Sequence, residues 1–297
     1  MRGVIAAVAT PVDAKGRLNV HTFERLIDRL IESGVDGVCL GGATSEYPSV
    51  AVDDRKAAIE AAAPRVPRDR TFLVAIGAPT LRQVVDLGQA AQSAGCGAVL
   101  LPMPMFFRYQ QDDLRAFAVE ASRALAAPVL LYDLPEFTNP LEPETVIALL
   151  NDERFITGIK DSSGARGHLP AYAAARNGRD WTLLVGHDEL LYEGLSAGWN
   201  GTVSGIACFC PELPVAIYRS HVAGDGQRAR DLQTLLDEVI VQLGILPAPW
   251  GVRVALDLRG FDMGPLPLPL SAARREQVNR FREWLPAWLD KVTLAVR

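Results

Sequence analysis

The sequence predicts an α/β fold, a (β/α)8 TIM barrel with appended C-terminal helices. Short apolar runs rich in β-branched residues alternate with longer segments whose apolar residues recur every three or four positions. This alternation favours a parallel sheet, and eight apolar runs are present, as a closed barrel requires. The chain has 297 residues, more than the roughly 250 typical of such a barrel, so we expect further helices after the last strand.

Each expected strand is bounded by glycine, proline or polar turn residues, which is typical of strand ends. In chain order the strands are VIAAVAT from Val4, GVCLGG from Gly37, TFLVAIG from Thr71, GAVLLPM from Gly97, PVLLYDLP from Pro128, FITGIK from Phe155, WTLLVGH from Trp181 and GTVSGI from Gly201.

The segments between these runs have the pattern of amphipathic helices. From Asn19 to Gly34, Asn19 can cap the start of a helix and Gly34 its end. The apolar stripe of this helix consists of Val20, Phe23, Leu26, Ile27, Leu30 and Ile31. Helical patterns also cover residues 228–244 and 272–296. We therefore expect a barrel over residues 1–224 and a C-terminal helical extension of the same domain over residues 225–297.

Composition and charge exclude several classes of function. A formal net charge of −5 gives no basic surface for nucleic acid or anionic lipid, so we expect neither partner. The four cysteines, Cys39, Cys96, Cys208 and Cys210, are too few and too poorly spaced for a disulfide framework or a zinc site. No apolar run approaches the roughly 20 residues of a membrane span. A reducing cytoplasmic location is expected.

Polar side chains gather where the strands end, and in such barrels function lies at the carboxyl ends of the strands. Thr10, the turn from Gly41 to Glu46, Tyr132, Lys160 and Ser204 all follow or close a strand. No matched pair of carboxylates indicates a glycosidase, and no clustered histidine or carboxylate ligands indicate a metal. We therefore expect no metal and no cofactor, and the amine of Lys160 is the distinctive group.

Two interpretations of Lys160 remain open from its position. Burial disfavours the charged form of a lysine, so a free amine could attack a carbonyl and form a Schiff base. The resulting iminium would accept electrons as a carbon–carbon bond breaks or forms. Alternatively, Lys160 could form a structural ion pair with Asp161 or another carboxylate.

Several motifs occur together and in one order along most of the chain. They are ATPVDAKGRLN near the start, GGATSE from Gly41, LLYDLPEFT from Leu130, GIKDSSG from Gly158 and GTVSGIACFCPE from Gly201. Together they resemble the dihydrodipicolinate synthase and N-acetylneuraminate lyase family, from Gly3 to about Leu270. The resemblance implies a barrel with C-terminal helices, a homotetramer or homodimer, and aldolase chemistry on pyruvate or another 2-oxo acid. Lys160 falls on the Schiff-base lysine of that family.

The same resemblance implies roles for five other residues. Tyr132 matches the tyrosine that shuttles protons beside the imine. The pyruvate carboxylate would bind at the turn after the second strand, through the Thr44 hydroxyl and the backbone N–H groups of Thr44 and Ser45. Gly186 and Val203 would line the pyruvate pocket. In the alternative view, the turn is an ordinary polar loop and the tyrosine a core residue with a hydrated hydroxyl.

Three departures from the family pattern disfavour the synthase of lysine biosynthesis. Ala43 stands where a hydroxyl residue joins the proton relay, and Phe106 falls where a second tyrosine reaches across the subunit interface. Phe137 replaces an arginine that clamps the carboxylate of the incoming aldehyde. Residues 135–138 and 106–114 instead resemble the branch that acts on 2-oxo-3-deoxy sugar acids.

An aldolase that splits such an acid into pyruvate and an aldehyde is the first interpretation, and a dehydratase using the same imine is the second. A barrel that binds a 2-oxo acid without turnover stays open, because Ala43, Phe106 and Cys208 depart from the pattern. A metal-dependent hydrolase lacks a ligand set. His187, Asp188 and Arg108 could contact a sugar chain, and Ser204 or a water could replace the missing relay hydroxyl.

Overall fold

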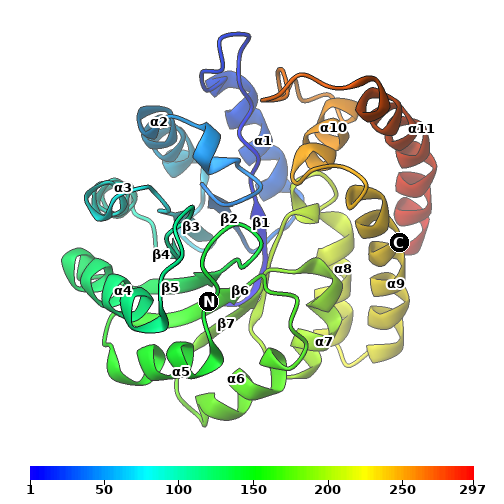
Figure 1. Ribbon diagram of the computed structural model, residues 1–297. Helices are drawn as coiled ribbons and strands as arrows, with labels where there is room; N and C mark the ends of the chain where they lie inside the picture. Colours follow the sequence, from blue (N-terminus) through cyan, green and yellow to red (C-terminus); the bar gives the residue numbers. More distant parts are fainter.

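The computed structural model describes residues 1–297 and contains eight parallel strands that close into a barrel (Figure 1). Each strand pairs with its neighbours in the sequence, and β1 closes the barrel against β8. The strands are β1 (Gly3–Ala7), β2 (Gly37–Leu40), β3 (Thr71–Ala75), β4 (Ala98–Pro102), β5 (Val129–Asp133), β6 (Ile156–Asp161), β7 (Thr182–Val185) and β8 (Gly201–Ser204). The predicted fold class and all eight predicted strands are confirmed.

Helices surround the barrel, and the last three pack together on one side, beside α8 (Figure 1). They are α1 (Val20–Glu32), α2 (Val52–Ala62), α3 (Leu81–Ser93), α4 (Gln111–Leu125), α5 (Pro143–Asp152), α6 (His168–Arg176), α7 (Leu191–Ser196), α8 (Glu212–Val222), α9 (Gly226–Leu243), α10 (Trp250–Leu258) and α11 (Ala272–Ala295). No helix is both long and apolar enough to cross a membrane.

The first helix shows how the local sequence sets an element's limits. The Asn19 side chain accepts a hydrogen bond from the Thr22 N–H and caps the start of α1, and Gly34 follows its end with φ at +80°. Most of the expected stripe is buried against the barrel, but Val20 is 43% exposed. The prediction for Val20 was wrong because this first helical residue precedes the turn that packs on the barrel.

The apolar side chains form two layers. An inner cluster that includes Ile5, Leu73, Leu130 and Val203 fills the barrel, and a larger outer one lies between the strands and the helices. Successive strand residues point to opposite faces, so alternate residues contribute to the inner and outer layers. This alternation decides which polar residues at the strand ends point into the barrel mouth.

The appended helix α10 is fastened to the barrel by Arg253. This guanidinium is 3% exposed and donates to the Thr10 carbonyl at 3.2 Å and to a Glu46 carboxylate oxygen at 2.8 Å. It also bonds the carbonyls of Met263 and Pro265, which follow α10. A buried charge is stable only when it is paired and hydrogen-bonded, and here those partners join the first two strand-end loops to the C-terminal segment.

Candidate active site

The register of β5 and β6 brings Tyr132 and Lys160 side by side. Both side chains point into the barrel, where Tyr132 is 1% exposed and Lys160 is 4% exposed. The Nζ atom of Lys160 lies 4.0 Å from the centroid of the Tyr132 ring. The structure therefore places an amine and a phenol together at the carboxyl ends of two adjacent strands.

The interpretation of Lys160 as a structural ion pair with Asp161 is wrong. The Asp161 side chain lies on the opposite face of β6, and its Oδ2 lies 2.8 Å from His168 Nδ1. No carboxylate oxygen lies within 4.0 Å of the Lys160 amine, so its nitrogen is not held by any acid.

Gly186 leaves room for the lysine. A Cβ atom at this position would lie 2.8 Å from Lys160 Cε and 2.1 Å from Ser162 Oγ, so only glycine fits there. Val203 belongs to the same inner cluster as Tyr132 and is 1% exposed. Gly186 thus borders Lys160, and Val203 lies in the inner layer together with Tyr132.

The turn after β2 starts at Gly41, whose φ of +70° is favourable only for glycine. Ser45 is committed to this turn: its N–H donates to the Gly42 carbonyl at 3.1 Å, and its hydroxyl donates to the Val8 carbonyl at 2.6 Å. The N–H groups of Ala43 and Thr44 donate to no protein acceptor. The donors available to a ligand are therefore those of Ala43 and Thr44, while Ser45 holds the turn in shape.

Asp188, in the loop after β7, faces the same mouth. A Cβ on Gly205 would lie 3.3 Å from Thr44 Oγ1 and 4.0 Å from Asp188 Oδ2, so these two groups flank that glycine. Asp188 Oδ2 accepts the Ile206 N–H at 3.3 Å, whereas its Oδ1 has no partner. Burial raises the pKa of the Asp188 carboxyl, and the neighbouring Ser204 hydroxyl, the Ile206 N–H and the charge of Lys160 partly oppose this shift.

Further polar atoms near the mouth lack hydrogen-bond partners. Ser162 Oγ and His187 Nδ1 are buried and unsatisfied. Ser204 Oγ accepts the Ala207 N–H at 3.0 Å, and Arg108 lies exposed on the loop between β4 and α4. Because buried polar atoms in native proteins usually have partners, Ser162, His187 and Asp188 indicate a place for a polar ligand or water.

A cleft of about 570 Å³ opens beside the mouth, between the loops after β2 and β5 and the segment joining α9 to α10. Ala43, Thr44, Glu136 and Phe137 are among the residues that line it. Phe137 is 46% exposed. Alanine and phenylalanine side chains carry no hydroxyl and no guanidinium, so Ala43 and Phe137 bring neither group to the cleft.

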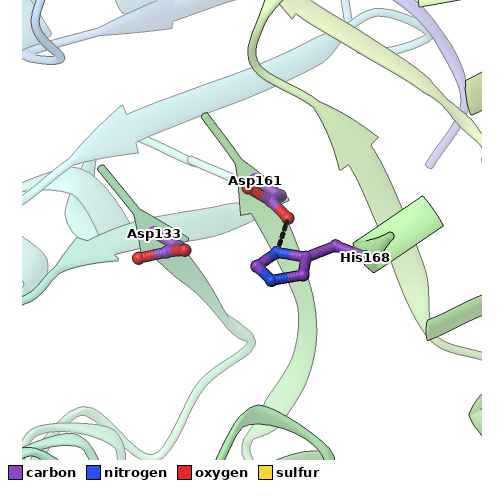
Figure 2. A group of neighbouring side chains, drawn as sticks. All are labelled: Asp133, Asp161 and His168. Atoms are coloured by element: carbon purple, nitrogen blue, oxygen red, sulfur yellow. Dashed lines mark hydrogen bonds and ion pairs between the residues drawn. The ribbon is translucent and has the colours of Figure 1, made fainter. Parts of the chain in front are cut away.

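The structure also reveals a group that was not predicted (Figure 2). Asp133, Asp161 and His168 offer ligand atoms that all lie within 4.8 Å of one another, behind the strands that carry Tyr132 and Lys160. This clustering of two carboxylates and a histidine, on the outer face of β5 and β6, was not expected from the sequence. The pairing of β5 with β6 places Asp133 beside Asp161, and His168 is the first residue of α6. The three residues thus come from three different elements.

Comparisons with known proteins agree with this geometry. The model of the dihydrodipicolinate synthetase family matches residues 1–287. A lyase of uncharacterised role from Halobacterium salinarum, described as DapA-like, is 36% identical over 91% of this chain and 88% of its own. The 4-hydroxy-tetrahydrodipicolinate synthase 1 of Streptomyces coelicolor is 35% identical over 92% of this chain and 89% of its own.

A solved structure extends the likeness to a ligand-bound protein. YagE of Escherichia coli, solved in complex with pyruvate, superposes with a TM-score of 0.89 at 26% identity, covering 97% of this chain and 98% of that one. YagE carries the provisional name 2-dehydro-3-deoxy-D-gluconate aldolase. From its family model, its relatives and its closed barrel, the chain belongs to the dihydrodipicolinate synthetase family, whose members are lyases.

Proposed function

We propose that this enzyme is a Schiff-base-forming aldolase that cleaves a 2-oxo-3-deoxy sugar acid into pyruvate and an aldehyde, or joins them. One observation supports this above all: Lys160 is 4% exposed, and its amine has no acid partner and lies 4.0 Å from the Tyr132 ring centroid. A buried, unpaired amine at the carboxyl end of a barrel strand is a nucleophile for a carbonyl.

The reaction follows from these two groups. Lys160 Nζ adds to the C2 carbonyl of the acid, and loss of water leaves an iminium. In that loss of water the Tyr132 phenol gives its proton to the departing hydroxyl and becomes a phenolate. Breaking the C3–C4 bond sends its electron pair into the iminium, while the C4 hydroxyl returns a proton to this phenolate, directly or through a water. The aldehyde leaves, C3 of the enamine is protonated, and addition of water releases pyruvate and the free amine.

The remaining site residues suit the two ends of such a substrate. The free N–H groups of Ala43 and Thr44 and the Thr44 hydroxyl can receive the carboxylate, and Gly186 and Val203 bound the pyruvate portion. The unpartnered atoms of Ser162, His187 and Asp188 offer hydrogen bonds to hydroxyls farther along the chain. YagE, a relative with a similar fold, binds pyruvate.

A synthase activity is less well supported, although one relative that is 35% identical has that name. Phe137 lines the cleft where an incoming carboxylate would need a cationic clamp. Ala43 adds no hydroxyl to the proton route, and Phe106 is 91% exposed. The aldolase therefore remains the better proposal.

We also propose that the chain forms a homodimer or homotetramer. Four aromatic side chains on two adjacent loops are exposed: Phe106, Phe107, Tyr109 and Phe137. This set is called the aromatic patch below. Exposed apolar groups gathered in one place are typical of protein interfaces.

Borohydride trapping tests the catalytic proposal. The protein is incubated with pyruvate, reduced, digested and examined by peptide mass spectrometry. We expect one adduct, on Lys160, that is absent from Lys160→Ala and retained in Lys56→Ala, whose surface amine pairs with Asp86 at 2.6 Å. A panel of 2-oxo-3-deoxy acids, with products identified by NMR, then separates cleavage from dehydration.

The outcomes are distinct. An adduct together with aldehyde release supports the aldolase, and an adduct with dehydrated product replaces it with the dehydratase. An adduct without any turnover would make the protein a 2-oxo acid binder. If wild-type protein forms no adduct with pyruvate or with any of the acids, the Schiff-base mechanism is wrong.

A further inference from the structure

A buried polar cluster lies directly behind the reactive pair. Tyr132 pairs with Lys160 in the register of β5 and β6, and the next residues, Asp133 and Asp161, pair with each other. Because side chains alternate along a strand, the first pair points into the barrel and the second points toward α5 and α6. Figure 2 shows Asp133 and Asp161 on adjacent strands, with the His168 ring beside Asp161. We call Asp133, Asp161 and His168 the outer cluster.

The outer cluster ties the ends of both strands to the loops that follow them. Asp161 Oδ2 lies 2.8 Å from His168 Nδ1, and Asp161 Oδ1 accepts the Ser163 N–H at 2.7 Å. Asp133 Oδ1 accepts the Leu141 N–H at 3.0 Å. The carboxyl end of β6 and the loop after it are thus joined to α6 at His168 Nδ1, which lies 2.8 Å from Asp161 Oδ2 and 3.2 Å from Ser163 Oγ.

The charges in this region favour a proton on His168. Neither Asp133 nor Asp161 pairs with a lysine or arginine, and the other titratable groups facing them are Glu144 of α5 and Tyr172 of α6. The hydrogen bond to Asp161 raises the pKa of His168, while burial raises the pKa of Asp133 to about 6. The imidazole is therefore the one cationic group available to two buried carboxyls.

Packing fixes the imidazole in place. The rings of His168 and Tyr172 are 5.3 Å apart, and Tyr172 is 0% exposed with a hydroxyl that has no partner. Burial and the nearby carboxylates raise the pKa of that hydroxyl, so it stays neutral. His168 Nδ1 already lies at hydrogen-bond distance from Asp161 Oδ2 and Ser163 Oγ, which favours a proton over a metal at this nitrogen.

We propose that His168 is a positioning residue, which through Asp161 holds the carboxyl end of β6 so that the Lys160 amine stays beside Tyr132. The proposal rests on the Schiff-base function proposed above. An attacking amine must be held close to its reaction geometry, and a displacement of about 1 Å can lower a rate about a hundredfold. Asp161 is the residue next to Lys160, so a shift of the Asp161 backbone moves the amine directly.

The test measures both the rate and the final extent of imine trapping at saturating pyruvate. His168→Phe keeps a ring against Tyr172 but lacks the donor, and His168→Asn keeps a donor near the Nδ1 position. We expect His168→Phe to slow trapping about ten- to a hundredfold, with every chain finally labelled and the KM for pyruvate changed less than about threefold. His168→Asn should recover most of the rate, and His21→Phe, at an exposed histidine of α1, should match wild type.

A second variant guards against loss of folding. Asp161→Asn keeps the side-chain shape and the acceptor for Ser163, and should slow trapping as His168→Phe does. NMR titration of the imidazole should give a His168 pKa above its ordinary value, which falls in Asp161→Asn. This titration does not depend on catalysis.

The possible failures can be told apart. If wild type traps no pyruvate, the proposed function fails. If wild type traps pyruvate and both variants match its rate, the positioning role is wrong. Incomplete final labelling in proportion to an unfolded fraction would show a merely structural role, and a His168 pKa insensitive to Asp161→Asn would remove the link itself.

Discussion

At the scale of single residues, the Lys160 amine rests against an aromatic ring and not against a carboxylate. A carboxylate at hydrogen-bond distance would hold the nitrogen and compete with an incoming carbonyl. The acid next to it in the sequence, Asp161, is instead engaged by His168 on the other face of the strand. The same strand alternation thus turns the Lys160 amine into the barrel and its neighbouring carboxylate out of it.

Tyr132→Phe separates the two contributions of the tyrosine. The variant keeps the aromatic ring, whose centroid lies 4.0 Å from Lys160 Nζ. It loses the hydroxyl, which is the group that would move protons. We expect kcat for cleavage to fall about 10²- to 10⁴-fold, with borohydride trapping of pyruvate slower but still complete. Tyr109→Phe, at an exposed tyrosine, is the control. An unchanged kcat in steady-state assays would exclude the phenol as the proton carrier.

Gly186→Ala tests the space beside the lysine. The added methyl would lie 2.8 Å from Lys160 Cε, closer than carbon atoms can approach, and 2.1 Å from Ser162 Oγ. We expect imine trapping to fall at least about a hundredfold, because the amine must move away from its place. Gly97→Ala is the matched control, since a Cβ there meets no atom within 4 Å. Normal trapping by Gly186→Ala would show that the pocket yields without displacing Lys160.

At the scale of elements, the end of β5 carries a carboxyl group that opposes folding at neutral pH. Burial raises the pKa of Asp133 from 3.8 to about 6, so the unfolded chain ionises first as pH rises. The free energy of unfolding therefore falls as the pH rises from about 4 to about 6, by roughly 2–3 kcal/mol at most, and it stays at the lower value above pH 6.

Asp133→Asn should remove this penalty while keeping an oxygen acceptor for the Leu141 N–H. We expect the variant to be more stable than wild type at pH 8, by roughly 1–3 kcal/mol, and nearly equal to it below pH 4. Urea unfolding followed by circular dichroism across this range measures the difference. A constant difference at every pH would mean that the gain does not come from the Asp133 charge.

The elements differ in how well the sequence predicts them. The strands were predictable because each is a short apolar run between turn residues, and α1 because its stripe and cap are both present. Helix α10 was not predicted. Its residues from Trp250 to Leu256 are all buried, Arg253 included, although a charged residue in a helix ordinarily lies on an exposed face.

The site divides in the same way. Lys160 and Tyr132 could be placed because each ends a strand within a specific motif, and the structure brings them together. The outer cluster could not, because Asp133, Asp161 and His168 meet only through strand register and the position of α6. The hydrogen bonds that commit Ser45 to its turn, including one to Val8 of the preceding loop, were likewise invisible in the sequence.

At the scale of the whole molecule, the aromatic patch argues for a partner copy. Phe106 is 91% exposed and has a φ of +75°, a backbone conformation that is strained by about 1–3 kcal/mol for such a residue. The loop is nevertheless held in this shape, because Asn139 Nδ2 donates to the carbonyls of Pro104 and Phe107 at 2.7 and 2.8 Å. Because the fold holds a strained phenylalanine ring in solvent, we expect that ring to contact a second copy of the chain.

The double variant Phe106→Ser/Phe107→Ser tests this use. The two rings contact each other edge to face at 5.0 Å between centroids and are 91% and 64% exposed, so their loss should leave the barrel folded. Wild type should sediment as a dimer or tetramer, and the variant should dissociate with a constant at least about 30-fold higher, as loss of an interface hot spot predicts. The control is Val241→Ser/Leu294→Ser, two residues 66% and 70% exposed on α9 and α11. A monomeric wild type, or a variant that assembles as tightly, would show that the patch faces solvent for another reason.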